Sequence, residues 1–294
     1  MQVGVQKKPL GFCVGNPPIA GEHYELALPS DHLSYTQIDC YLKCPENYRR
    51  TYVWGQRGGM NAAMYQGLLL TAVLEQVGLW ALKGTTAKIS NPKAALSLHK
   101  KYVKDGIPSQ RGQTGKKGIT KIEDVVSWLD TNPGTVVAQN EIFIQLFYRK
   151  ELPTIAKAIV AVEDEFQMQL AGVNVLGYID LTERHFVWDY KTSNSGGFFL
   201  KPDSSLQLKL GAHARQKEKA GYIVFDKGKK DVYAKRTSEP WDLRQVKEWL
   251  EFTVGSVAMA ISAGIFPPCS PGENALCSQK WCPHWWDCAG KSPE

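Results

Sequence analysis

Residues 177–192, GYIDLTERHFVWDYKT, decide the fold of this 294-residue chain. Apolar and polar residues alternate along this stretch, which predicts two strands, about 173–181 and 185–192. The short polar segment between them predicts a hairpin with Glu183 and Arg184 at its tip. We therefore expect these strands to pair within the central sheet of the protein.

Asp180, Asp189 and Lys191 are the candidate catalytic residues. The predicted register makes the two aspartates diagonal neighbours, roughly 7–8 Å apart at the backbone, with Lys191 on the same face. Two carboxylates repel each other unless a cation intervenes, and their hard oxygens suit Mg²⁺ or Mn²⁺. In phosphodiester hydrolysis, a lysine beside the metal-bound water orients that water or stabilises the developing negative charge. An exposed Asp-x-Lys pair is also a common surface pattern, so these residues alone do not decide the function.

A glutamine on the next predicted helix adds to this hypothesis. Ser204 is expected to cap a helix that runs to about Lys217, and Gln207 lies on its apolar stripe with Leu210. A buried amide needs hydrogen-bond partners. Lys191, or a water that Lys191 orders, is one candidate partner, and the backbone is the other.

The order of these residues resembles the RecB-like branch of the PD-(D/E)XK nucleases, in which an Asp, an Asp/Glu-x-Lys and a Gln-x-x-x-Tyr helix follow one another. The resemblance implies a restriction-endonuclease-like α/β core sheet flanked by helices. It also implies that Asp180 and Asp189 bind the metal, that Tyr190 offers its backbone carbonyl, that Lys191 is the catalytic lysine and that Gln207 is the helix residue.

Two positions depart from the family pattern. The family usually carries a metal-binding His four residues after a helical Gly, and here Gly67 is followed at that place by Thr71. Gly211 replaces the Tyr of the Gln-x-x-x-Tyr motif. These departures predict a weaker metal site, a preference for a particular ion, or reduced activity.

Cysteines form the second informative pattern. Seven are present, and an odd number clustered toward one end is a poor disulfide framework. Cys277, Cys282 and Cys288 are separated by four and five residues, which leaves a four-ligand site one ligand short. Cys44, in the segment Tyr41-Leu-Lys-Cys44-Pro45, resembles the first cysteine of AddB nuclease domains and of RecB-like exonucleases associated with CRISPR adaptation, especially their bacteriophage-borne relatives.

That resemblance implies a structural 4Fe-4S cluster bound by Cys44, Cys277, Cys282 and Cys288. A zinc ion and uncoordinated thiols are the alternatives. Cys40 competes as the fourth ligand, whereas Cys13 and Cys269 are expected to be ordinary small apolar residues. His284 is a possible zinc ligand but is expected to be a surface histidine.

The rest of the chain predicts one nuclease domain, 34–294, after an irregular lead-in, 1–33. This domain has a helical N-terminal part, a basic insert at about 85–118 and a cluster-bound cysteine tail at 265–294. The other expected strands are about 159–170, 222–226 and 232–235. The expected helices are about 34–42, 60–82, 120–129, 139–151, 204–217 and 240–264.

The basic insert contains the residues expected to contact nucleic acid: Lys100, Lys101, Arg111, Lys116 and Lys117. Lysine and arginine bind phosphates regardless of sequence, although such a run is also typical of a solvated surface. We expect an exonuclease acting on single-stranded DNA ends; an endonuclease and a catalytically weak DNA-binding or recombination-accessory protein are the alternatives. Recombination or CRISPR-type proteins are candidate partners, and a cytoplasmic location without a membrane is expected because no signal or spanning segment is recognisable.

Overall fold

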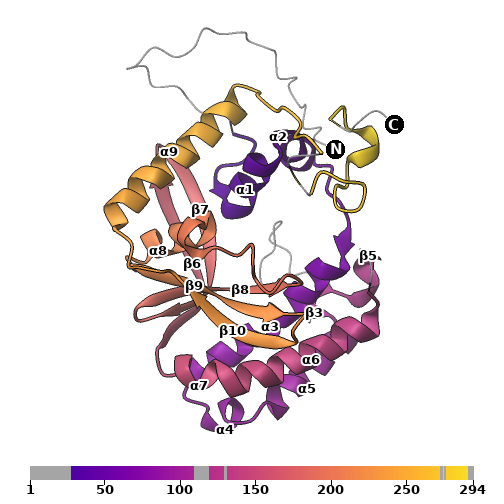
Figure 1. Ribbon diagram of the computed structural model, residues 1–294, viewed down its shortest axis with the longest axis vertical. Coiled ribbons are helices and arrows are strands. Elements are labelled where there is room, and N and C mark those ends of the chain that lie inside the picture. Colours follow the sequence, from indigo (N-terminus) through magenta and orange to yellow (C-terminus); the bar gives the residue numbers. More distant parts are fainter. Residues whose placement is uncertain (1–27, 109–118, 129–130, 272–273, 275, 291–294) are drawn as a thin grey trace, which may run out of the picture.

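The computed structural model describes residues 28–108, 119–128, 131–271, 274 and 276–290, which form a central mixed sheet flanked by helices (Figure 1). The expected α/β architecture is confirmed. The sheet runs in the order β1-β7-β8-β9-β10, and β6 pairs with the other edge of β7. Its strands are β1 (Leu33–Ser34), β6 (Ile159–Leu170), β7 (Val173–Glu183), β8 (Phe186–Ser193), β9 (Lys219–Asp226) and β10 (Asp231–Arg236).

The two hairpins around β7 differ in extent. β6 and β7 form a long antiparallel ladder joined by Ala171 and Gly172, whose φ angles of 49° and 77° fit a two-residue hairpin turn. β7 and β8 form a short ladder, with Thr182 opposite Val187. The exposed tip of the second hairpin is therefore residues 184–185, and the predicted tip, 183–184, is wrong. Because the register moves by two residues, the face of each side chain is unchanged.

One edge of β7 is shared between two partners. β8 pairs with it at Leu181 and Thr182, and β1 pairs in parallel at Val175 and Leu176. Residues 177–180 lie between these two ladders. Beyond the short ladder, β8 continues alongside β9 in parallel to its last residue.

Helices pack on both faces of the sheet (Figure 1). One core joins α3, α6 and α7 to one face, and another joins α1, α8 and α9 to the opposite face. The helices are α1 (Tyr35–Lys43), α2 (Pro45–Tyr48), α3 (Ala62–Leu82), α4 (Thr86–Ile89), α5 (Lys93–Asp105), α6 (Pro133–Lys150), α7 (Leu152–Ile155), α8 (Leu206–Ala214) and α9 (Leu243–Ser262). None of them is long and apolar enough to span a bilayer, within the described residues.

Several helix ends follow the predicted signals. Ser34 caps α1 in a reciprocal capping box with Gln37, and Pro45 separates α1 from α2. α3 ends just before Gly84, whose φ is 63°. The expected helices at 34–42 and 60–82 are therefore confirmed.

Other predicted helix ends are wrong. Asn132 begins α6, because its side chain accepts a hydrogen bond from the Thr135 amide at 2.9 Å and Pro133 suits the first helical position. The helix expected at 120–129 is replaced by a short 3-10 helix (Ile122–Asp124) and by β5 (Val125–Ser127), which pairs with β2 (Met60–Asn61). Asn, Pro and Gly are common both in turns and at the start of helices, so the local sequence did not show which of the two residues 132–134 form.

The basic stretch is partly helical and partly outside the described residues. α4 and α5 lie within it, and α5 packs against α3 and α6 with Ala95 and His99 fully buried. After α5, β3 (Ile107–Pro108) pairs with β4 (Ile119–Thr120). Lys100 and Lys101 are exposed on α5. Arg111, Lys116 and Lys117 lie outside the described part of the chain.

Candidate active site

Asp180 lies where β7 and β8 separate. Its Oδ2 accepts a hydrogen bond from the Tyr190 backbone amide at 2.8 Å. Tyr190 is buried, and a buried amide needs an acceptor. The Asp180 carboxylate supplies this acceptor at the point where the ladder has ended, and it is thereby fixed beside residues 189–191.

The backbone opposite Asp180 is unusual. Glu163 of β6 has a φ of 48°, in the left-handed region that non-glycine residues rarely adopt. Glu163 lies between the ladder pairs Val162–Leu181 and Asp164–Ile179, across from Asp180. Such backbone conformations often occur at functional sites, so this irregularity supports a special role for the region around Asp180.

Asp189, Lys191 and Gln207 form a connected polar network. Lys191 Nζ lies 2.7 Å from Asp189 Oδ2 and donates a hydrogen bond to Gln207 Oε1 at 3.0 Å. The Gln207 amide nitrogen in turn donates to Asp189 Oδ1. Asp189 is 4% exposed, so its charge is held by these two neighbours rather than by bulk water. Lys191 is therefore the partner of Gln207 that the sequence suggested.

The helix that carries Gln207 begins one residue later than predicted. Ser205, not Ser204, caps α8, because the Ser205 hydroxyl accepts a hydrogen bond from the Leu208 amide at 3.1 Å. Tyr222 of β9 donates to the same hydroxyl at 2.6 Å. The start of α8 is thus attached to the sheet next to the Asp189 network.

Charge around Lys191 is balanced by the two carboxylates. Burial alone would lower the pKa of Lys191, but the negative charges of Asp189 and Asp180 outweigh burial and raise this pKa well above its usual range. The carboxylates thus stabilise a cation at Nζ.

The donor set suits a hard divalent cation. Among the described residues, no group of three or more His, Cys, Asp or Glu side chains forms a ready metal site. Mg²⁺ typically uses one or two carboxylates and takes its remaining oxygens from water and substrate phosphates. The carboxylates of Asp180 and Asp189 match that requirement in number and in ligand type.

Sequence comparison then identifies the family. The model of the PD-(D/E)XK nuclease superfamily matches residues 32–289. The chain belongs to this superfamily. No curated protein sequence matches the chain significantly.

Two solved structures are similar to this nuclease-family chain. One is the crystal structure of SSO0001, with 13% sequence identity, a TM-score of 0.41 and coverage of 93% of this chain and 91% of that chain. The other is named "Putative exonuclease" and comes from Eubacterium rectale, with 13% identity, a TM-score of 0.48 and coverage of 95% of this chain and 97% of that chain.

The two departures from the PD-(D/E)XK pattern have different structural settings. Thr71 is half-buried on α3, which packs on the face of the sheet opposite α8. Gly211 on α8 packs directly on the sheet: a Cβ there would lie 3.0 Å from Ile179 Cγ1 and 3.8 Å from Val187 Cγ2. Glycine at this position permits a close approach of α8 to β7 and β8, which a larger side chain would oppose.

A second polar network was not predicted from the sequence. Arg215, at the end of α8, donates two hydrogen bonds to the Asp164 carboxylate at 2.7 and 2.6 Å, and the Thr182 hydroxyl donates to the same carboxylate at 2.9 Å. This network joins α8 to β6 and β7. The aspartate and the arginine are 51 residues apart, and neither lies in a motif, so no local signal pairs them.

Replacing Arg215 with alanine is expected to destabilise the protein by about 2 kcal/mol at pH 7, since a charge-assisted bidentate contact is lost. Burial alone would raise the pKa of Asp164, but hydrogen bonds from Arg215 and Thr182 outweigh it and lower this pKa. Because the pKa of Asp164 is lower in the native than in the unfolded state, its contact with Arg215 stabilises the fold fully at pH values above the unfolded pKa of about 3.9. This stabilisation is lost as the pH falls through the native pKa. Arg215→Ala should therefore lower the free energy of unfolding, measured in urea, by less at pH 3 than at pH 7. Equal losses, or an equal effect of exposed Arg244→Ala, would contradict this role.

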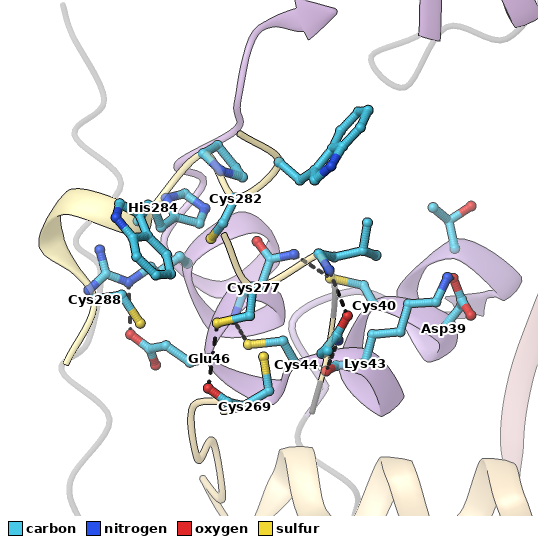
Figure 2. Close-up of a pocket in the computed structure, with 18 of the residues that line it drawn as sticks. Asp39, Cys40, Lys43, Cys44, Glu46, Cys269, Cys277, Cys282, His284 and Cys288 are labelled. Atoms are coloured by element: carbon cyan, nitrogen blue, oxygen red, sulfur yellow. Dashed lines mark hydrogen bonds and ion pairs between the residues drawn. The ribbon is translucent and has the colours of Figure 1, made fainter. Parts of the chain in front are cut away.

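Cysteines from both ends of the described chain line one cavity of about 430 Å³. Figure 2 shows the sulfurs of Cys44, Cys269 and Cys277 near the centre of the view, with Cys282 and Cys288 around them and Cys40 to one side. Cys44 begins α2, whereas the others, apart from Cys40, come from the tail after α9. Cavities of this size are typical of ligand and cofactor sites, ~300–1,000 Å³.

Several sulfurs already accept hydrogen bonds from the backbone. The Asn47 amide donates to Cys44 Sγ at 3.4 Å, and the Gly290 amide donates to Cys288 Sγ at 3.4 Å. The His284 amide bonds the Cys282 thiol in the same way. Amide donors of this kind stabilise thiolates and tune metal–sulfur sites.

Cys269 and His284 differ from the sequence expectation. Cys269 lines the cavity, and its backbone carbonyl accepts a hydrogen bond from the Cys277 thiol at 3.6 Å, so it is more than a small apolar residue. Burial and the neighbouring thiols of Cys44 and Cys277 raise the pKa of Cys269 to about 12. His284 is 9% exposed and lines the same cavity, so it is not a surface histidine. The tail folds back on α2, which brings both residues in.

Proposed function

We propose that this protein is a Mg²⁺- or Mn²⁺-dependent deoxyribonuclease that degrades DNA from single-stranded ends. The observation that carries the proposal is the network in which Lys191 bridges Asp189 and Gln207 beside Asp180, within a chain of the PD-(D/E)XK nuclease superfamily. The preference for ends is supported by the resemblance of the cysteine pattern to RecB-like exonucleases. Recombination or CRISPR-type proteins are the proposed partners.

Each residue of the network has a proposed role. Asp180, Asp189 and the Tyr190 carbonyl would hold the divalent cation, which, when bound, supplies an activated water and neutralises phosphate charge. Lys191 is placed to orient the attacking water and to stabilise negative charge that develops on the phosphoryl oxygens. Gln207 positions Lys191 through the 3.0 Å hydrogen bond and holds Asp189 through its amide nitrogen.

We propose that the cysteine cavity holds a structural 4Fe-4S cluster. Cys44, Cys277, Cys282 and Cys288 would be its ligands, and soft thiolates are suited to iron-sulfur clusters and also to zinc. Cys269 is an alternative fourth ligand, because its thiol lies beside those of Cys44 and Cys277. The cluster would join α2 to the tail and thereby restrict the unfolded chain.

End-labelled substrates test the proposed activity. Anaerobically prepared protein with Mg²⁺ or Mn²⁺ is expected to degrade linear single strands and to leave closed circular single strands intact. Cleavage of the circles would identify an endonuclease. Binding of both substrates without cleavage under any divalent cation would instead favour the catalytically weak DNA-binding protein that Thr71 and Gly211 suggest.

A further inference from the structure

Two phenylalanines project from the loop between β8 and α8. Phe198 is 70% exposed and Phe199 is 78% exposed, and their ring centroids lie 5.1 Å apart in a nearly perpendicular arrangement. Adjacent aromatic rings at this exposure are costly to keep in water. Two adjacent exposed rings form a small apolar patch, and such patches often mark a binding site.

This loop is built to hold the rings outward. Gly196 and Gly197 have φ angles of 59° and 64°, and the Gly197 amide donates to Ser193 Oγ at 3.0 Å. Tyr233 of β10 donates a hydrogen bond to the Gly196 carbonyl. Lys235 of β10 donates to the Gly197 carbonyl at 3.0 Å. The base of the loop is thus anchored from two strands, and the rings are presented on a fixed support.

A lysine-rich turn abuts the same loop. The turn between β9 and β10 contains Lys227, Lys229 and Lys230, and the last two are exposed. The Lys227 amide donates to the Ser193 carbonyl at 2.8 Å, and a Cβ on Gly228 would lie 3.2 Å from the Asn194 carbonyl. Aromatic and cationic side chains therefore lie on neighbouring loops at one end of the sheet.

Both loops are adjacent to the candidate catalytic residues. Ser193, which anchors the phenylalanine loop, follows Lys191 by two residues on β8, roughly 7 Å along the strand. The other end of the loop leads into α8, which carries Gln207. A strand bound across these loops would thus lie next to the Asp189 network.

We propose that this aromatic–lysine surface, formed by Phe198, Phe199, Lys227, Lys229 and Lys230, binds the single-stranded DNA that is cleaved. The rings stack on bases, and the lysines contact the phosphates. Sequence-independent single-strand sites combine these two elements, because every base has a flat face and every linkage carries a charge. This inference rests on the proposed function and assigns the contact to residues outside the basic insert.

Binding of fluorescent single strands in EDTA tests the surface without cleavage. The double variant Phe198→Ala/Phe199→Ala is expected to bind a base-containing oligonucleotide at least about tenfold more weakly, given the usual effect of losing a stacked base. An abasic oligonucleotide of equal length offers nothing to stack on, so wild type and double variant should bind it alike. Phe198→Trp/Phe199→Trp should retain wild-type affinity. Lys229→Gln/Lys230→Gln should reduce the slope of log K against log salt by about 0.7 for each lost contact, with either oligonucleotide.

Phe252→Ala provides the matched control, because Phe252 is 76% exposed and belongs to α9 rather than to the β8–α8 loop. It should bind like wild type. If the protein cleaves DNA and the phenylalanine double variant binds base-containing strands like wild type, the proposed binding surface is wrong and the proposed function stands. An equal loss for the abasic strand also overturns the stacking role. Wild-type protein that neither binds nor cleaves DNA overturns both proposals.

Discussion

Replacing Lys191 with alanine is expected to reduce DNA cleavage by about 10³-fold or more while DNA binding persists. The alanine removes the cation that lies 2.7 Å from Asp189 and donates to Gln207. Negative charge that develops during phosphodiester cleavage then lacks its positive neighbour. Single-turnover cleavage of an end-labelled strand in Mg²⁺ and in Mn²⁺ measures the effect, with binding measured in parallel in EDTA. Asp189→Ala is expected to show the same loss.

Lys247→Ala is the matched control for this substitution. Lys247 also pairs with a carboxylate, Glu251 at 3.3 Å, but it does so on the exposed side of α9. Its replacement should leave cleavage unchanged. Cleavage at the wild-type rate by both Lys191→Ala and Asp189→Ala would remove the proposed roles of these residues.

Replacing Cys44 with serine is expected to remove the cofactor and to destabilise the fold. Serine is nearly the same size as cysteine, so the main loss is the link between α2 and the tail. Restricting the roughly 230-residue loop between Cys44 and Cys277 is worth about 5 kcal/mol in chain-entropy terms, which corresponds to a fall of about 10 °C or more in Tm. Iron content, visible absorbance and thermal unfolding of anaerobically purified protein measure the outcome.

Cys40→Ser tests whether Cys40 is a ligand of the cluster or only a neighbouring thiol. Cys40 lines the same cavity and is half-buried, yet its sulfur accepts a hydrogen bond from the Asn47 side chain at 3.4 Å and lies to one side in Figure 2. This variant should keep its iron and its Tm. Iron-free wild-type protein, or iron loss in Cys40→Ser equal to that in Cys44→Ser, would contradict the proposed ligand set. Stoichiometric zinc would support the alternative ion.

Period-two and helical patterns predicted much of the fold. The expected strand 159–170 is β6, and the expected helix 60–82 corresponds to α3. The position of the turn in the second hairpin was predicted wrongly. Alternation of apolar and polar residues shows which face of the sheet each side chain occupies, but not which two residues form the turn. Asn132 was predicted to follow the end of a helix but instead caps the start of α6, because the same residue types occur at both places.

Contacts between distant segments could not be read locally. The sequence suggested a link between Gln207 and Lys191, because a glutamine in an apolar stripe needs a partner. No comparable signal linked Arg215 to Asp164 or brought Cys269 beside Cys44. Those contacts depend on how α8 and the tail pack on the rest of the chain, which only the folded structure shows.

Counting bound Mn²⁺ by electron paramagnetic resonance tests the central claim most directly. Wild-type protein is expected to bind Mn²⁺ at the carboxylates, and the double variant Asp180→Asn/Asp189→Asn, which keeps side-chain size but removes both charges, should lose that ion while remaining folded. Mn²⁺ binding by the double variant with wild-type stoichiometry and affinity would contradict the claim that these two carboxylates hold the divalent cation.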